Sequence, residues 1–176
     1  MSELRVRLFE ITENRQPHTH RNLIERLAEE FPHTIRVIEG QAPIERYTCA
    51  MHAFGLIEND EYIRIVQAAP PYIFASPSFI QRLVLKSRLT ELPNPQPGAL
   101  IVYSEFGCAK HAGKMLAADH VESKWGVGHL YHHGVLEVSG NYGSELRSFE
   151  AIDTDFALDE FAEYAREHGV RLEGDA

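Results

Sequence analysis

The sequence has few cysteines, few basic residues and no long apolar run. Its two cysteines, Cys49 and Cys108, are too few for a disulfide framework, and such a pair is more typical of reduced thiols. Lys and Arg total 17 against 26 Asp and Glu, a formal net charge of −9, so a nucleic-acid partner is not expected. No run approaches the roughly 18 apolar residues of a membrane span, and MSELRVRLFEI lacks the apolar centre of a secretory signal. We therefore expect a cytoplasmic protein that does not contact membranes.

The sequence does have enough apolar residues for one folded unit. A length of 176 residues, 44% of them hydrophobic, predicts a single domain with a real core. Alternating apolar residues over 4–11 predict a strand, and apolar spacing of three and four after a Thr19 cap predicts a helix as far as Phe31. TIRVIEG predicts a short strand. Further helices are expected in RYTCAMHAFGL, which Gly55 ends, and over 78–89.

The character of the chain changes after the linker PNPQPG. Short segments rich in β-branched and aromatic residues follow, as is typical of an antiparallel meander: GALIVYSE, HAGKMLAA, HVESKWGVG, GVLEVSG and LRSFEAI. A last amphipathic helix is predicted over 153–172, capped by Thr154 or Asp155. The predicted fold class is α+β, with N-terminal helices packed on a C-terminal antiparallel sheet. The single domain divides into a strand-helix-strand extension (1–40), a core (41–152) and the final helix.

Cys49 lies near the start of a predicted helix, where a thiol becomes reactive. The unpaired N–H groups and the dipole of a helix N-terminus favour the thiolate. A thiol nucleophile also needs an imidazole that takes its proton. His52 lies on the same helix, which leaves little room for a substrate between the two groups, so it is the second choice. His111 begins a strand after GALIVYSE and can face a helix packed on the sheet, so it is the preferred base.

The order of these motifs resembles the papain-like NlpC and CHAP superfamily of cysteine peptidases and amidases. TCAMHAFG is similar to the family's cysteine at a helix start, PGALIVYSE to its glycine-started strand, and KHAGKML to the next strand, which a histidine begins. SKWGVGHLYHHGVLEVSGNYG also resembles the tail of uncharacterised bacterial papain-like proteins. The resemblance covers Pro43 to Phe149 and implies a papain-like fold for that part of the chain.

The resemblance implies a role for each matching residue. Cys49 is the nucleophile, and His111, 62 residues later, is the general base. The third polar residue of the family falls on Ser123, where His, Asn, Gln, Asp or Glu is more usual. A neutral hydroxyl stabilises an imidazolium less than a carboxylate does. Thr48 stands where the family often has Asp or Asn. Tyr47, a candidate donor to an oxyanion beside the Cys49 N–H, and Thr48 are the candidate oxyanion or substrate contacts.

Two alternative interpretations stay open. Cys108 and His111 have the spacing of metal ligands, and His129, His132 and His133 are further candidate nitrogen ligands, although no second tight pair is present. A catalytically degenerate papain-like module that binds or regulates a protein partner fits the unusual third position.

The function predicted from the sequence is that of an intracellular cysteine hydrolase or acyltransferase. It would use a Cys–His pair on a peptide, amide or acyl substrate that carries an amide, ester or thioester bond. We expect no cofactor and no bound metal in this function. Trp125, the single tryptophan, is interpreted first as a core residue and second as a substrate contact.

Overall fold

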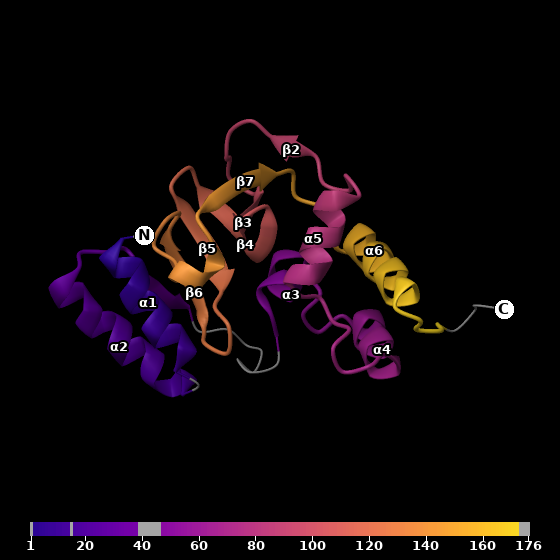
Figure 1. Cartoon of the computed structure of the whole chain (residues 1–176), viewed down its shortest axis with the longest axis horizontal. Helices are drawn as coiled ribbons and strands as arrows, with labels where there is room; N and C mark the ends of the chain where they lie inside the picture. The colour runs from indigo at the N-terminus through magenta and orange to yellow at the C-terminus, as the bar shows by residue number, and fades with distance from the viewer. Residues whose placement is uncertain (1, 15, 39–46, 173–176) are drawn as a thin grey trace.

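The computed structural model describes residues 2–14, 16–38 and 47–172, and these form an α+β fold (Figure 1). The helices are α1 (Glu3–Glu13), α2 (Pro17–Glu30), α3 (Cys49–Ala53), α4 (Asp60–Ala68), α5 (Pro77–Leu85) and α6 (Thr154–Glu167), with a 3-10 turn η2 (Gly140–Tyr142). The strands are β1 (Arg36–Ile38), β2 (Glu91–Leu92), β3 (Leu100–Glu105), β4 (Cys108–Ala117), β5 (His120–Lys124), β6 (Leu130–Gly134) and β7 (Glu145–Phe149). Pro43 and the predicted start of the core at residue 41 lie outside the described residues.

The strands form one antiparallel sheet in the order β1-β6-β5-β4-β3-β7-β2. Helices α3 and α5 contact the central strand β4, and α6 packs behind α5. Helices α1 and α2 lie on the opposite side of the sheet (Figure 1). The α+β class and the antiparallel sheet predicted from the sequence are confirmed.

Each face of the sheet has its own hydrophobic cluster. On what we call the first face, Val102 and Ala112 pack with residues of α3, α5 and α6. On the second face, Ile101 and Tyr103 pack with residues of α1, α2 and η2. Neighbouring residues of a strand point to opposite faces. The faces of these residues therefore fix the faces of the other side chains in β3 and β4, as far as no bulge interrupts the alternation.

The N-terminal segment contradicts the prediction of a strand over 4–11. These residues belong to α1, in which Arg5, Leu8 and Ile11 are buried. A period of three places them on one side of a helix, and that side packs against α2 and η2. The alternation in ELRVRLFEI is short enough to fit both patterns. The described part of the extension, residues 2–14 and 16–38, is therefore helix-helix-strand.

Several other elements have shifted bounds. α2 begins at Pro17 rather than after a Thr19 cap, since proline is favoured in the first turn of a helix. α5 begins at Pro77 and ends at Leu85, earlier than predicted. The predicted strand GVLEVSG is mostly turn, and β6 is the preceding segment LYHHG. α4, which is not among the predicted elements, begins where the Asn59 side chain accepts the Tyr62 N–H at 2.9 Å.

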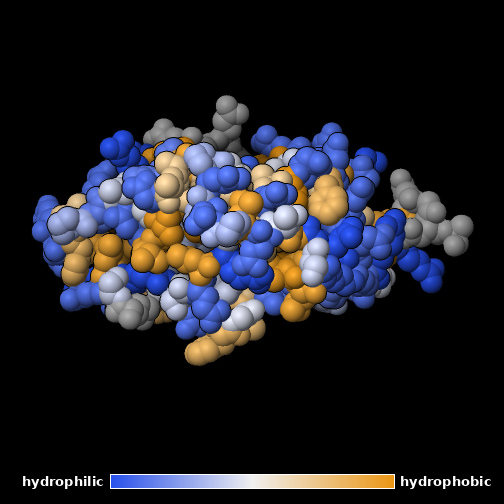
Figure 2. All heavy atoms as spheres, turned by 90° about the horizontal axis from the view of Figure 1, so that it is seen from above, coloured by the Kyte–Doolittle hydropathy of each residue, from blue (hydrophilic) through white to orange (hydrophobic). Residues whose placement is uncertain are grey.

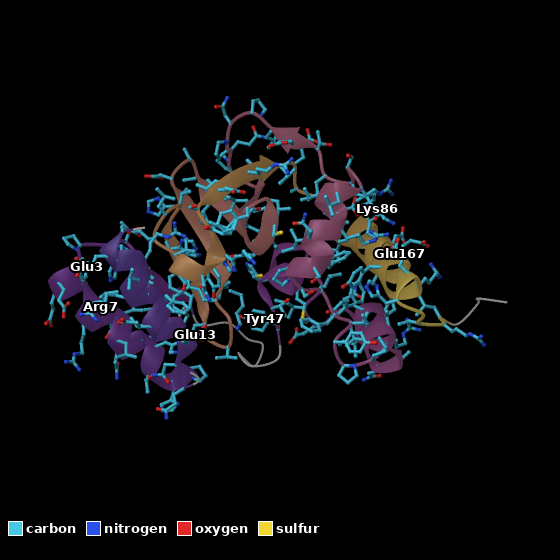
Figure 3. The ribbon with its side chains drawn as sticks, viewed as in Figure 1. Glu3, Arg7, Glu13, Tyr47, Lys86 and Glu167 are labelled. Atoms are coloured by element: carbon cyan, nitrogen blue, oxygen red, sulfur yellow. The ribbon has the colours of Figure 1, made fainter. Side chains whose placement is uncertain are left out.

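The predicted final helix is confirmed as α6. Its cap is Asp153, one residue earlier than expected, whose side chain accepts the Phe156 N–H at 2.7 Å. Ion pairs join α6 to α5: Arg82 Nη1 lies 2.8 Å from Glu160 Oε2, and Lys86 pairs with Glu167. Figure 3 labels Lys86 and Glu167 side by side at this helix pair.

The surface of the described residues is predominantly hydrophilic. Figure 2 shows hydrophilic side chains over most of the face seen from above, with apolar groups between them. Phe106, Leu85 and Tyr72 are the most exposed large apolar residues, and they come from separate segments, which is ordinary for a protein surface. Within the described ranges, no helix combines the length and apolar character that a membrane crossing requires.

Candidate active site

Cys49 is the first residue of α3, and Thr48 caps that helix. Thr48 Oγ1 accepts the Met51 N–H at 3.1 Å and donates to the Ala75 carbonyl at 2.5 Å. The predicted helix start at Cys49 is confirmed. Because α3 has only five residues, its dipole is weaker than the sequence suggested, and local N–H groups matter more. The single hydroxyl proton of Thr48 is committed to Ala75, so in this structure Thr48 is a helix cap and not an oxyanion donor.

The Cys49 thiol lies against β4 where the pairing of β4 with β5 ends. The N–H and C=O of Met115 both bond to the residues just before β3. Because the backbone groups of successive residues point to opposite edges of a strand, the Ala112 N–H points toward β5. In the described chain the β4–β5 register ends at the pair Lys114–Glu122 and does not reach Ala112. The Ala112 N–H interacts with the Cys49 sulfur instead. The thiol thus takes the position in which a backbone acceptor of β5 would otherwise meet the Ala112 N–H.

His111 directly precedes Ala112, but its side chain points to the other face. It pairs with Tyr103 and so lies on the second face, whereas Cys49 packs with Ala112 on the first. The residue is 1% exposed, and its Nε2 has no hydrogen-bond partner among the described residues. Tyr142 stacks on its ring, with 4.0 Å between centroids and 6° between planes. The structure therefore brings Cys49 and His111 to neighbouring points of β4, without a hydrogen bond from His111 Nε2 to the sulfur.

In the structure the Ser123 hydroxyl is hydrogen-bonded to His133 and Trp125. His133 Nδ1 contacts the Gly134 carbonyl at 2.8 Å and must donate to it, so His133 Nε2 accepts the Ser123 hydroxyl proton at 2.7 Å. Trp125 Nε1 donates to Ser123 Oγ at 3.0 Å. Burial lowers the pKa of His133 to about 4, which agrees with a neutral ring. Trp125 has no exposed surface and is a core residue here, as the first interpretation held.

Lys124 is a fully buried cation on the first face, and the sequence analysis did not select it. Its Nζ donates to the Gly126 carbonyl at 2.5 Å and lies 4.8 Å from the centroid of the Tyr47 ring. If the β4–β5 register continued, Lys124 would stand opposite Ala112, where the thiol lies. Tyr47, which Figure 3 labels near the start of α3, is 6% exposed. We therefore assign to Tyr47 a cation–π contact with Lys124.

The environment keeps both proposed reactive groups neutral. Burial raises the pKa of the Cys49 thiol, while the N–H groups of Ala112 and Ala50 and the charge of Lys124 act in the opposite direction. Burial lowers the pKa of His111 well below its ordinary value, and the electrostatic effects of His133, Lys124 and His52 act in the same direction. The resting state is a thiol near a neutral imidazole and not a preformed thiolate–imidazolium pair.

His52, the second-choice base, is engaged by a carboxylate. His52 Nε2 lies 3.1 Å from Glu122 Oε1, and His132 Nε2 lies 2.8 Å from Glu122 Oε2. The contact with His52 lowers the pKa of Glu122, and with the hydrogen bond from His132 it outweighs the opposite effect of burial, which brings that pKa to about 2. The ionised carboxylate thus ties α3 to β5 and β6.

The residues of the metal alternative point to different places. Cys108 is exposed at the start of β4, and His129 Nε2 lies 2.9 Å from the Pro17 carbonyl. His132 and His133 are engaged by Glu122 and Ser123, on opposite faces of the sheet. Across residues 2–14, 16–38 and 47–172, no three His, Cys, Asp or Glu side chains are arranged to hold a metal ion.

Two neighbours of the proposed pair, Lys124 and Tyr142, are not among the residues selected from the sequence. A lysine next to Ser123 in an alternating strand is expected to face solvent, but the start of α3 covers that face. Tyr142 belongs to SGNYG, which predicts a tight turn, and Gly143 does adopt φ 94° there. The signal for Lys124 is its place two residues after Glu122, which puts both side chains on one face of the strand. Nothing local in the sequence indicates what Tyr142 contacts.

No family model, curated protein or solved structure matches this chain.

Proposed function

We propose that the protein is a papain-like cysteine hydrolase or acyltransferase in which Cys49 is the nucleophile and His111 the general base. The observation that supports it best is the position of the thiol beside Ala112, the residue that follows His111 on β4. The thiol interacts with the Ala112 N–H, and the adjacent His111 carries a buried Nε2 without a hydrogen-bond partner in the described chain. Such a group costs about 1–3 kcal/mol, so its presence calls for a functional explanation.

The reaction starts from two neutral groups. As the sulfur attacks the carbonyl carbon, the S–H proton passes to His111, which becomes imidazolium, and the carbonyl oxygen becomes an oxyanion. The N–H groups of Cys49 and Ala50 interact with the sulfur and are candidate donors for that oxyanion. Lys124 favours the thiolate by its charge. The proton transfer requires the His111 ring and the sulfur to meet in the gap where β4 and β5 stop pairing.

The second half of the reaction follows from the first. The tetrahedral intermediate expels an amine, alcohol or thiol, which takes the proton from His111, and an acyl group remains on Cys49. Attack by water completes a hydrolysis, and attack by another acceptor completes an acyl transfer. The proposed substrate is a peptide, amide or acyl compound with an amide, ester or thioester bond, in the cytoplasm, and the reaction needs no cofactor.

An ester probe tests the proposal. A Cys108→Ser background removes the exposed thiol, and the protein is treated with p-nitrophenyl acetate and examined by peptide mass spectrometry. We expect acetyl-Cys49 to form in the background variant, and to form about 100-fold more slowly in His111→Ala, because general-base assistance contributes on that order. The matched control is His120→Ala, since His120 is a partly exposed histidine on β5. Equal rates in His111→Ala and His120→Ala would overturn the assignment of His111.

One observation favours a second candidate, a catalytically silent papain-like module that binds a protein partner. Cys49 is 8% exposed and His111 is 1% exposed, and both are neutral in the resting state. A protein that forms no acetyl-Cys49 in the folded state, but does so after unfolding in urea, would be of this second kind.

A further inference from the structure

We infer that Tyr142 is the positioning residue for His111, in the place that the family pattern gives to a polar third residue. This inference rests on the proposed function. His111 is held by an aromatic stack rather than by a hydrogen bond: its ring lies parallel to Tyr142, 4.0 Å away, and Tyr103 closes a second side at 5.6 Å and 50°. A parallel stack at this distance fixes the plane of an imidazole while leaving both of its nitrogens free to react.

Within the described ranges, no hydrogen bond to His111 Nε2 competes with the stack in orienting the ring. Ser123, on the same face, donates its only proton to His133 and accepts from Trp125. His111 Nε2 has no hydrogen-bond partner in the described chain. An unrestrained imidazole would occupy several rotamers, so the ring plane must be set by packing. Tyr142 supplies that packing from η2, which contacts both β3 and β4.

The turn that carries Tyr142 is itself tied down from the N-terminal extension. Arg5 on α1 is buried and donates to the carbonyls of Val138 at 3.2 Å and Ser139 at 3.4 Å, and also to that of Gly143. Thr12 Oγ1 lies 3.0 Å from Ser139 Oγ. These contacts bracket Tyr142 on both sides along the chain. Helix α1, outside the predicted core, thus belongs to the support of the site.

Gly143 allows the turn to come this close to the sheet. Its φ of 94° disfavours other residues, and a Cβ at this position would overlap the Ser104 carbonyl of β3. The backbone on one side of Tyr142 is therefore pressed against β3, next to Tyr103. This close approach places the Tyr142 ring over His111 without a long connecting segment.

The test separates stacking from hydrogen bonding with three variants: Tyr142→Phe, Tyr142→Leu and Ser123→Ala. The readout is NMR of the His111 ring, labelled with ¹³C and ¹⁵N and assigned with His111→Gln. The aromatic ring at position 142 should shift the signals of the His111 ring protons in the unsubstituted protein and in Tyr142→Phe. We expect this ring-current shift to be lost in Tyr142→Leu. Ser123→Ala should move the His133 signals and leave those of His111 in place. A Tyr142→Leu spectrum with unchanged His111 signals, or a Ser123→Ala spectrum in which they move as far, would overturn the inference.

A second pair of variants tests the support from α1. Arg5→Met removes the donors to the η2 turn and should produce the same direction of change in the His111 signals as Tyr142→Leu. Arg7→Met is the matched control, because Arg7 lies on the same helix and pairs with Glu10 at the surface (Figure 3). Equal spectra for the two arginine variants would contradict the role of Arg5.

The proposed function can fail without this inference failing. If no acetyl-Cys49 forms, the catalytic assignment is lost, but the His111 spectra still report whether Tyr142 sets the ring. If acetyl-Cys49 forms, the rate should fall about tenfold in Tyr142→Leu and be largely retained in Tyr142→Phe, since a misplaced base costs on this order. A Tyr142→Phe protein as slow as Tyr142→Leu would show that the hydroxyl, and not the stack, is what matters.

Discussion

On the first face of the sheet, α3, α5 and α6 bury mainly aliphatic and phenyl side chains around Phe79. The ion pairs of Glu160 lie near the margin of this layer, and Lys124 is a buried cation within it. On the second face, Trp125, Tyr131, Ser123 and His133 lie deep in the packing and are joined by hydrogen bonds and ring contacts. The thiol belongs to the apolar face and the proposed base to the polar aromatic one. Reactivity therefore depends on the short stretch of β4 where the two environments meet.

The largest effect is expected from removing a large buried side chain from the second face. Trp125→Ala should lower the free energy of unfolding by about 3–5 kcal/mol, because it removes a large, fully buried side chain and leaves a cavity. Urea denaturation followed by circular dichroism measures the loss. Tyr72→Ala, at a residue 69% exposed, should change stability by less than about 0.5 kcal/mol. A small effect of Trp125→Ala would mean that the second face is not a tightly packed core.

A smaller change tests whether the polar network of the second face is structural. Ser123→Ala leaves His133 Nε2 and Trp125 Nε1 without their partner, and we expect a cost of about 2 kcal/mol in urea denaturation. Ser148→Ala is the matched control, since Ser148 Oγ is buried and has no hydrogen-bond partner in the described part of the chain. Its loss should be neutral or slightly stabilising. If both substitutions cost the same, the hydroxyl of Ser123 is not used as proposed.

The charged margin of the first face should matter less. Glu160 accepts from Arg82 and Arg88, and Glu160→Gln should cost about 1 kcal/mol at neutral pH, because the amide oxygen can still accept a hydrogen bond and Arg88 is 48% exposed, although Glu160 itself is buried. Burial raises the pKa of Glu160, but the hydrogen bonds from the two arginines outweigh this effect and lower the pKa overall. The contribution of Glu160 to stability is therefore present above the ordinary carboxyl pKa and is lost as the pH falls through the lowered pKa. Urea denaturation at neutral and acid pH should therefore show the difference between the two proteins shrinking in acid. A constant difference would assign the effect to packing.

The parts of the fold that sequence could predict are those set by local rules. The Thr48 cap and the helix start at Cys49 follow from side-chain hydrogen bonding within a few residues, and the amphipathic spacing over 154–167 specifies α6. The segment over 4–11 was ambiguous, because spacings of two and three overlap in so short a stretch. Only packing against α2 and η2 decides in favour of a helix.

The site was less predictable because its contacts are non-local. Which group takes the Ser123 proton depends on β6, which pairs Ser123 with Tyr131 and brings His133 alongside. A shift of one residue along such a strand changes the face on which every side chain lies. Likewise, the contact of Tyr142 with His111 joins positions 31 residues apart. Candidate residues could be selected from motifs, but their partners required the register of the sheet.

Lys124 is a buried cation that stands on the first face beside the thiol. In a Cys108→Ser background, the rate of Cys49 alkylation by iodoacetamide should rise with pH along a curve displaced above that of an ordinary thiol, because burial raises the pKa of Cys49. Lys124→Met removes a charge that favours the thiolate, so the midpoint should move further upward. Lys110→Met, at an exposed position of β4, should leave the midpoint where it was. Mass spectrometry of the Cys49 peptide gives the rates, and circular dichroism verifies that each variant is folded. A midpoint that does not change in Lys124→Met would mean that the charge of Lys124 does not act on the thiol, and a midpoint below that of a free thiol would mean that burial does not govern the ionisation of Cys49. In either case the difference between the two faces of the sheet would not control the chemistry of the thiol.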